Sequence, residues 1–72
     1  MKTNLQKRLA LQQIMDCTRV AIRSLDEITH FENLLLAGDN EDREYHEARL
    51  DRAIKAYNEA NEKIKQLNEE LL

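Results

Sequence analysis

A single glycine and the absence of proline limit most strongly what this 72-residue chain can fold into. Gly38 stands in the segment LLLAGDNED, residues 34 to 42. On both sides of it the chain is rich in Leu, Ala, Glu, Lys, Gln and Arg, which favour helix. Glycine adopts the left-handed backbone that closes many helices without a steric penalty from Cβ. The segment therefore predicts an αα-hairpin whose turn lies at Gly38 and Asp39.

Local signals set the expected bounds of the two helices. The tetrapeptide TNLQ, residues 3–6, matches a capping box, in which Thr3 and Gln6 each bond the other's backbone amide. Asp39 or Asn40 can cap the second helix, and acidic residues follow where the helix dipole favours them. We expect an all-α fold with helices at about residues 3–37 and 40–70, a turn at 38–39, and one domain spanning residues 1–72.

The apolar spacing of both halves predicts a coiled-coil seam between the helices. In the second half, alternation by three and four residues selects Leu50, Ala53, Tyr57, Ala60, Ile64, Leu67 and Leu71. In the first half, it selects Leu11, Ile14, Thr18, Ala21, Leu25 and Ile28. Folding the chain at position 39 brings Leu11 level with Leu67 and Ile28 level with Leu50. Every layer between these two is then matched.

The end of this seam near the turn is polar. The same fold places Glu32 opposite His46. We predict that they form a polar seam pair, in which a charge-assisted hydrogen bond helps to fix the register of the helices. The alternative is that both side chains project into solvent beside the open turn.

The first helix carries more apolar residues than one seam can cover. A second strip, here called the eleven-residue row because its first three members are eleven residues apart, contains Leu9, Val20, Phe31 and Leu34. Three further residues widen the seam on its other flank: Met15, Ile22 and Leu36. Contiguous exposed apolar surface points to association. We therefore predict that these residues form a dimer or partner interface and that two hairpins pair into a four-helix bundle.

No pattern in the chain predicts an enzyme, a metal site or a cofactor. Glu27-x-x-His30 has the ligand spacing of di-iron bundles but lacks the second motif that such a site needs. HEARL, residues 46–50, has Leu50 where a zinc-protease helix needs its second histidine. Cys17 is the only cysteine, which excludes an intramolecular disulfide and favours a cytoplasmic location. Neither a signal peptide nor a membrane-spanning segment is expected.

The expected function is that of a small, non-enzymatic protein–protein interaction module. A dimeric hairpin would act as a regulator or inhibitor by occupying the surface of another protein, a role that would suit a phage or other mobile element. The alternative is a nucleic-acid-binding dimer that uses Arg8, Arg19 and Arg23 of the first helix. The net charge of −3 and the acidic residues among these arginines favour the first hypothesis. Binding to a membrane surface is not expected.

Overall fold

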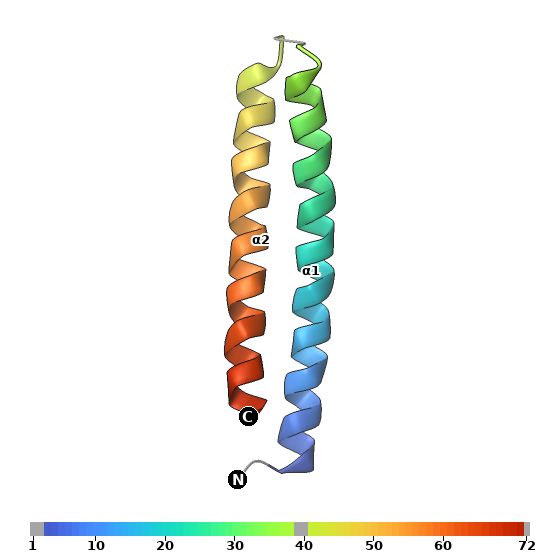
Figure 1. Ribbon diagram of the computed structural model, residues 1–72, viewed down its shortest axis with the longest axis vertical. Helices are drawn as coiled ribbons and strands as arrows, with labels where there is room; N and C mark the ends of the chain where they lie inside the picture. The colour runs from blue at the N-terminus through green and yellow to red at the C-terminus, as the bar shows by residue number, and fades with distance from the viewer. Residues whose placement is uncertain (1–2, 39–40, 72) are drawn as a thin grey trace.

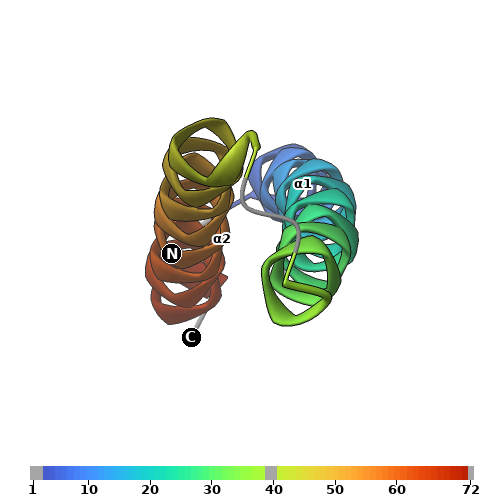
Figure 2. The same cartoon turned by 90° about the horizontal axis from the view of Figure 1, so that it is seen from above.

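The computed structural model describes residues 3–38 and 41–71, which form two long helices. Helix α1 spans Asn4–Leu36 and α2 spans Arg43–Leu71. They pack side by side and antiparallel in a rod of 55 × 13 × 13 Å (Figures 1 and 2). The predicted all-α hairpin is therefore confirmed.

The start of α1 is closed by the capping box that the sequence predicts. The Thr3 amide donates to Oε1 of Gln6 at 2.9 Å, and the Gln6 amide donates to Oγ1 of Thr3 at 3.2 Å. These two bonds satisfy amides that lack partners inside the helix. The helix begins at Asn4, as expected from Thr3 at the N-cap position.

The end of α1 depends on the backbone of Gly38. Its φ angle is +81°, in the left-handed region, as predicted. Apart from the chain neighbours of Gly38, no atom of the described residues lies within 4 Å of the point where a Cβ would stand, so the conformation, and not crowding, selects glycine. The Gly38 amide donates to the Leu35 carbonyl at 3.3 Å, which satisfies one of the last carbonyls of the helix. Asp39, the other predicted turn residue, lies outside the described residues.

Helix α2 begins at Arg43 and not at residue 40 as expected. Glu41 and Asp42 still belong to a turn, and the Asp42 carbonyl accepts the His46 amide at 2.9 Å. Asp side chains favour turns and caps over helix interiors, which agrees with Asp42 lying in the connection and not in the helix. Arg43 Nε then donates to Glu47 Oε1 at 2.9 Å across the first turn of α2.

The seam of α2 is the predicted one, whereas the seam of α1 is rotated. All seven predicted residues of α2 are buried or half-buried. On α1, Ile14, Ala21 and Ile28 are also covered, but the predicted Leu11, Thr18 and Leu25 are exposed. Four covered residues take the places of the predicted ones: Ala10, Cys17, Ser24 and Phe31. The prediction for this half of the α1 seam is wrong.

The rotation of α1 has a physical cause at the end near the turn. The predicted and the observed seam of α1 share the row Ile14, Ala21 and Ile28. They differ in the row added beside it, and both added rows keep the heptad spacing. The observed choice buries Phe31, the only phenylalanine, whereas the predicted choice would bring Glu32 into the seam. Burying an unpaired carboxylate is costly, and burying an aromatic ring is favourable. Small residues along the rest of the seam, including Ala10, Ala21, Ala53 and Ala60, let the helices approach closely.

Candidate interaction surface

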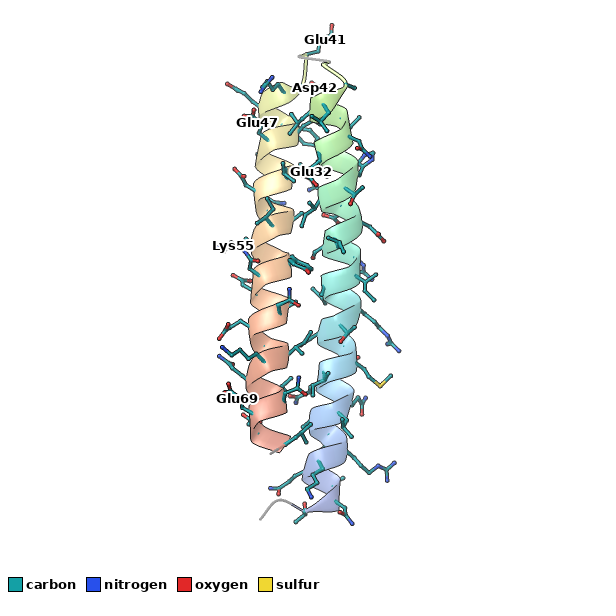
Figure 3. All side chains as sticks on the ribbon, in the orientation of Figure 1. Glu32, Glu41, Asp42, Glu47, Lys55 and Glu69 are labelled. Carbon is teal, nitrogen blue, oxygen red and sulfur yellow. The ribbon has the colours of Figure 1, made fainter. Side chains whose placement is uncertain are left out.

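The rotation leaves a second heptad row exposed along α1. This row, here called the outer stripe, consists of Leu11, Met15, Thr18, Ile22, Leu25, Thr29, Glu32 and Leu36, all of them exposed. Ile22 keeps 57% of its surface and Leu36 keeps 84%. The stripe lies about a quarter turn around α1 from the seam, since each residue advances the helix by about 100°. Glu32, close to its end at the turn, is labelled in Figure 3.

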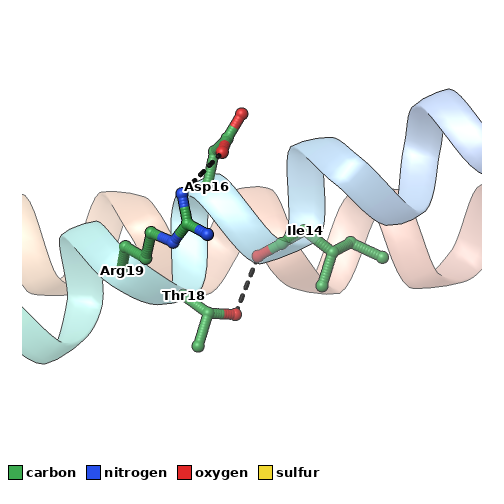
Figure 4. Close-up of polar contacts among 4 residues, drawn as sticks. All are labelled: Ile14, Asp16, Thr18 and Arg19. Atoms are coloured by element: carbon green, nitrogen blue, oxygen red, sulfur yellow. Dashed lines mark hydrogen bonds and ion pairs between the residues drawn. The ribbon is translucent and has the colours of Figure 1, made fainter.

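The two threonines do not interrupt the apolar character of the outer stripe. Oγ1 of Thr18 donates to the Ile14 carbonyl at 2.7 Å (Figure 4), and Oγ1 of Thr29 donates to the Leu25 carbonyl at 3.1 Å. Each hydroxyl is therefore satisfied by its own helix. Neither threonine needs a polar partner from another molecule, so a covering surface can be apolar from Leu11 to Thr29.

The predicted interface residues separate into exposed and buried groups. Met15, Ile22 and Leu36 are exposed, as the prediction requires, and belong to the outer stripe. Leu9 and Val20 are also exposed, but they lie on the opposite side of α1. These two groups cannot be covered by one flat surface.

Phe31 is a correction to the predicted interface. It is only 8% exposed, and its ring packs inside the hairpin, 5.9 Å from the His46 ring and 5.8 Å from the Arg49 guanidinium carbon. Leu34, the last member of the eleven-residue row, is half-buried. Eleven residues slightly exceed three turns, so the row winds around α1 toward the seam and is covered at its end near the turn.

Glu32 and His46 do not form the predicted polar pair. Glu32 is exposed on the outer stripe, whereas the His46 ring lies near the rings of Phe31 and Tyr45. Nδ1 of His46 is buried and has no hydrogen-bond partner among the described residues. The same rotation that buries Phe31 moves Glu32 out of reach.

The three arginines of the alternative hypothesis remain exposed along one side of α1. Nη1 of Arg19 lies 3.9 Å from Oδ1 of Asp16 (Figure 4), and both side chains are well exposed. Arg8 borders a shallow hollow that is otherwise lined by Leu5, Leu9, Leu11, Gln12 and Met15. The charge of Arg19 is thus partly offset on its own helix.

Two features are absent from the described ranges 3–38 and 41–71. In these ranges, no three or more His, Cys, Asp or Glu side chains come together as a metal site would require. Neither described helix has a stretch of sufficient length and apolarity to cross a membrane. Cys17, in the seam, is half-buried.

Sequence reasoning missed that Leu11 and Leu25 belong to the surface. A signal was present, since the row that contains these leucines continues to Glu32, whereas the neighbouring row continues to Phe31.

Comparison of the chain with protein-family models, with curated proteins and with solved structures finds no match.

Proposed function

We propose that this protein is a small, non-enzymatic interaction module that pairs with a second copy into a four-helix bundle. In this state it acts as a regulator or inhibitor by occupying the surface of another protein. The observation that carries the proposal is the outer stripe, which the hairpin leaves uncovered over most of the length of α1.

The composition of the two rows of α1 supports association. The row used inside the hairpin includes Ala10, Cys17 and Ser24, whereas the exposed row includes Leu11 and Leu25. Large aliphatic side chains of the exposed row are therefore in contact with water, while smaller residues lie in the seam. Contiguous apolar surface of this kind is uncommon on a monomer and is typical of interaction sites.

The surface area supports the same proposal. A compact monomer of 8.5 kDa would expose about 4,700 Å², whereas the hairpin exposes 5880 Å². Stable protein interfaces remove about 800 Å² from each partner. One such interface would bring the exposed area of each hairpin close to the value for a compact protein.

Analytical ultracentrifugation tests the self-association. The wild type should sediment as a dimer at micromolar concentration, and Ile22→Glu should sediment as a monomer because its carboxylate cannot be buried unpaired. Val20→Glu is the matched control: it lies two residues away, on the opposite side of α1, and Val20 is 47% exposed. Circular dichroism of each sample reports whether the helices remain. A monomeric wild type at several hundred micromolar would contradict self-association.

The regulatory part of the proposal requires a separate experiment. Tagged wild type and the Leu9→Glu/Val20→Glu variant are used to capture proteins from the native host. The two residues lie away from the outer stripe, so the variant should remain dimeric while a specific partner is lost. Equal capture by both chains, or capture by neither, would count against this part.

The nucleic-acid alternative has a distinct outcome. Titration of labelled DNA and RNA at low salt should show no binding under the proposed function. Binding that weakens steeply with salt, and weakens further in Arg8→Ala/Arg23→Ala, would favour the alternative instead.

A further inference from the structure

We infer that the outer stripe is covered by the outer stripe of a second copy, running antiparallel, with Ile22 of each copy packed against Leu25 of the other. This inference rests on the proposed function and specifies its interface. This interface does not include Val20 or Phe31, two residues of the interface predicted from the sequence. The two-fold axis lies between Ile22 and Leu25, near the middle of α1.

The outer stripe is complementary to itself in this arrangement. Antiparallel pairing about this axis brings Ile22 to Leu25, Thr18 to Thr29, and Leu11 to Leu36. Met15 meets Glu32 in a layer near each end, where the carboxylate can reach water. An interface with two-fold symmetry uses the same patch on both copies, so the patch must match its own reverse. The surface of an unrelated partner would place no such demand on the sequence.

Charges beside the stripe match as well. In an antiparallel pair, Arg19 of one copy comes close to Asp26 of the other, and the symmetry repeats this pair. Both residues are exposed on the side of the stripe away from α2. Among the described residues, Arg19 is paired only with Asp16, at the long distance of 3.9 Å. Complementary charges of this kind select orientation and register more than they add affinity.

Other arrangements of the same two stripes bring like charges together. Slipping the antiparallel pair by one heptad in one direction places Arg19 beside Arg19, and slipping it in the other direction places Asp26 beside Asp26. A parallel pair aligns Glu32 with Glu32 in a layer of the interface. Like charges at such positions are unfavourable, so one arrangement is preferred over its nearest competitors.

Helix α2 provides an independent indication of the same axis. Ser24 and Ala53 are both buried at the middle of the hairpin, and the Phe31–His46 contact shows that they lie at the same level. Ile54, the next residue, is 39% exposed. Its position on α2 faces the same side of the hairpin as the outer stripe. The proposed axis therefore passes at the level of Ile54, the exposed aliphatic side chain in the middle of α2.

Disulfide trapping tests the arrangement in the full chain. Thr18→Cys and Thr29→Cys are prepared separately in a Cys17→Ser background and oxidised mildly, alone and mixed. Both threonines are exposed, so the variants should retain the helices. The antiparallel pair predicts disulfides only in the mixture, each linking position 18 to position 29. The closest competing register separates these positions by about one heptad, or about 10 Å, which exceeds disulfide reach.

Each outcome of the trapping has a defined meaning when combined with sedimentation of the same samples. Links in the mixture alone support the inference. Links in either single variant would overturn it in favour of a parallel pair. No links in a sample that sediments as a dimer would overturn the register and leave the proposed function standing. A monomeric sample would overturn both.

Exchange of charges gives a second, independent test. Arg19→Asp and Asp26→Arg should each weaken dimerisation roughly fivefold, since two exposed ion pairs are reversed. The double variant should return to the dissociation constant of the wild type. Arg23→Asp, about 40° farther around α1 from the outer stripe than Arg19, is the control for net charge and should change less. Equal weakening by all three single variants, without rescue in the double variant, would contradict the predicted contact.

Discussion

The two helices have similar lengths, but the hairpin covers the apolar surface of α2 more fully than that of α1. Eight of the ten large apolar side chains that the structure shows as exposed lie on α1, and only Tyr45 and Ile54 lie on α2. Helix α2 has one apolar row, and the hairpin covers it. Helix α1 has two such rows, and the hairpin covers one. The hairpin therefore covers the apolar row of α2 but leaves one apolar row of α1 exposed.

This difference shows what a short antiparallel hairpin can and cannot stabilise. A chain of this size buries a small core, and its hydrophobic gain is close to the entropy lost on ordering. An additional apolar row raises stability only if another surface covers it. In the proposed dimer the outer stripe is covered, so the stability of α1 should depend on association, whereas the apolar row of α2 is already covered by α1.

The largest expected effect on stability comes from removing the ring of Phe31, which packs inside the hairpin. Phe31→Ala should lower the free energy of unfolding by about 3 kcal/mol, because it removes a large ring that is only 8% exposed and opens a cavity in the seam. Val20→Ala, in the same row but exposed, should cost less than about 1 kcal/mol. Urea unfolding followed by circular dichroism measures both. Equal costs would mean that the eleven-residue row is a continuous surface after all.

A pair of leucine substitutions compares the covered row of α2 with the outer stripe of α1. Leu67→Ala should cost about 2–3 kcal/mol at every protein concentration, since Leu67 is only 4% exposed within the hairpin. Leu25→Ala, 48% exposed, should cost little in dilute solution and more as the concentration rises. Thermal melts over a hundredfold range of concentration distinguish the two. If the cost of Leu25→Ala does not change over that range, Leu25 does not take part in association.

The sequence was sufficient to predict the hairpin, the capping box, the glycine turn and the seam of α2. Each depends on local chemistry or on a row that has no competitor. It was not sufficient for α1, where Leu11 and Ala10 satisfy the same heptad spacing. Which of the two rows is buried depends on Phe31 and Glu32, far along the helix, and thus on the free energy of burial summed over the whole seam. The contacts of His46 depend on which row of α1 is buried, so the residues next to it in the sequence could not predict them.

The junction between the helices should show an intermediate effect. Gly38→Ala should cost about 1–2 kcal/mol, because φ of +81° is unfavourable for a residue with a Cβ. Gly38→Asn should cost less, since asparagine tolerates the left-handed region better. No atom of the described residues beyond its chain neighbours crowds the position, so the difference between these variants reports the backbone conformation. Chemical unfolding with matched variants checks the order. Equal destabilisation by alanine and asparagine would point to another cause.

The smallest expected effect concerns the start of α1, the end that lies farthest from the turn. Thr3→Ala removes the acceptor of the Gln6 amide and should cost about 1 kcal/mol. Because the loss is local, hydrogen exchange should quicken most in the first turns of α1, and the end of α2 should change less. Gln6→Ala removes the reciprocal bond to the Thr3 amide and should have a similar but smaller effect. In the proposed dimer, Leu11 lies about two turns beyond Thr3 and packs against Leu36 of the second copy. Dimerisation should therefore suppress the fraying, and the protection lost in Thr3→Ala should recover as protein concentration rises. Exchange that stays equally fast at all concentrations would show that the outer stripe does not extend the dimer to this end of α1.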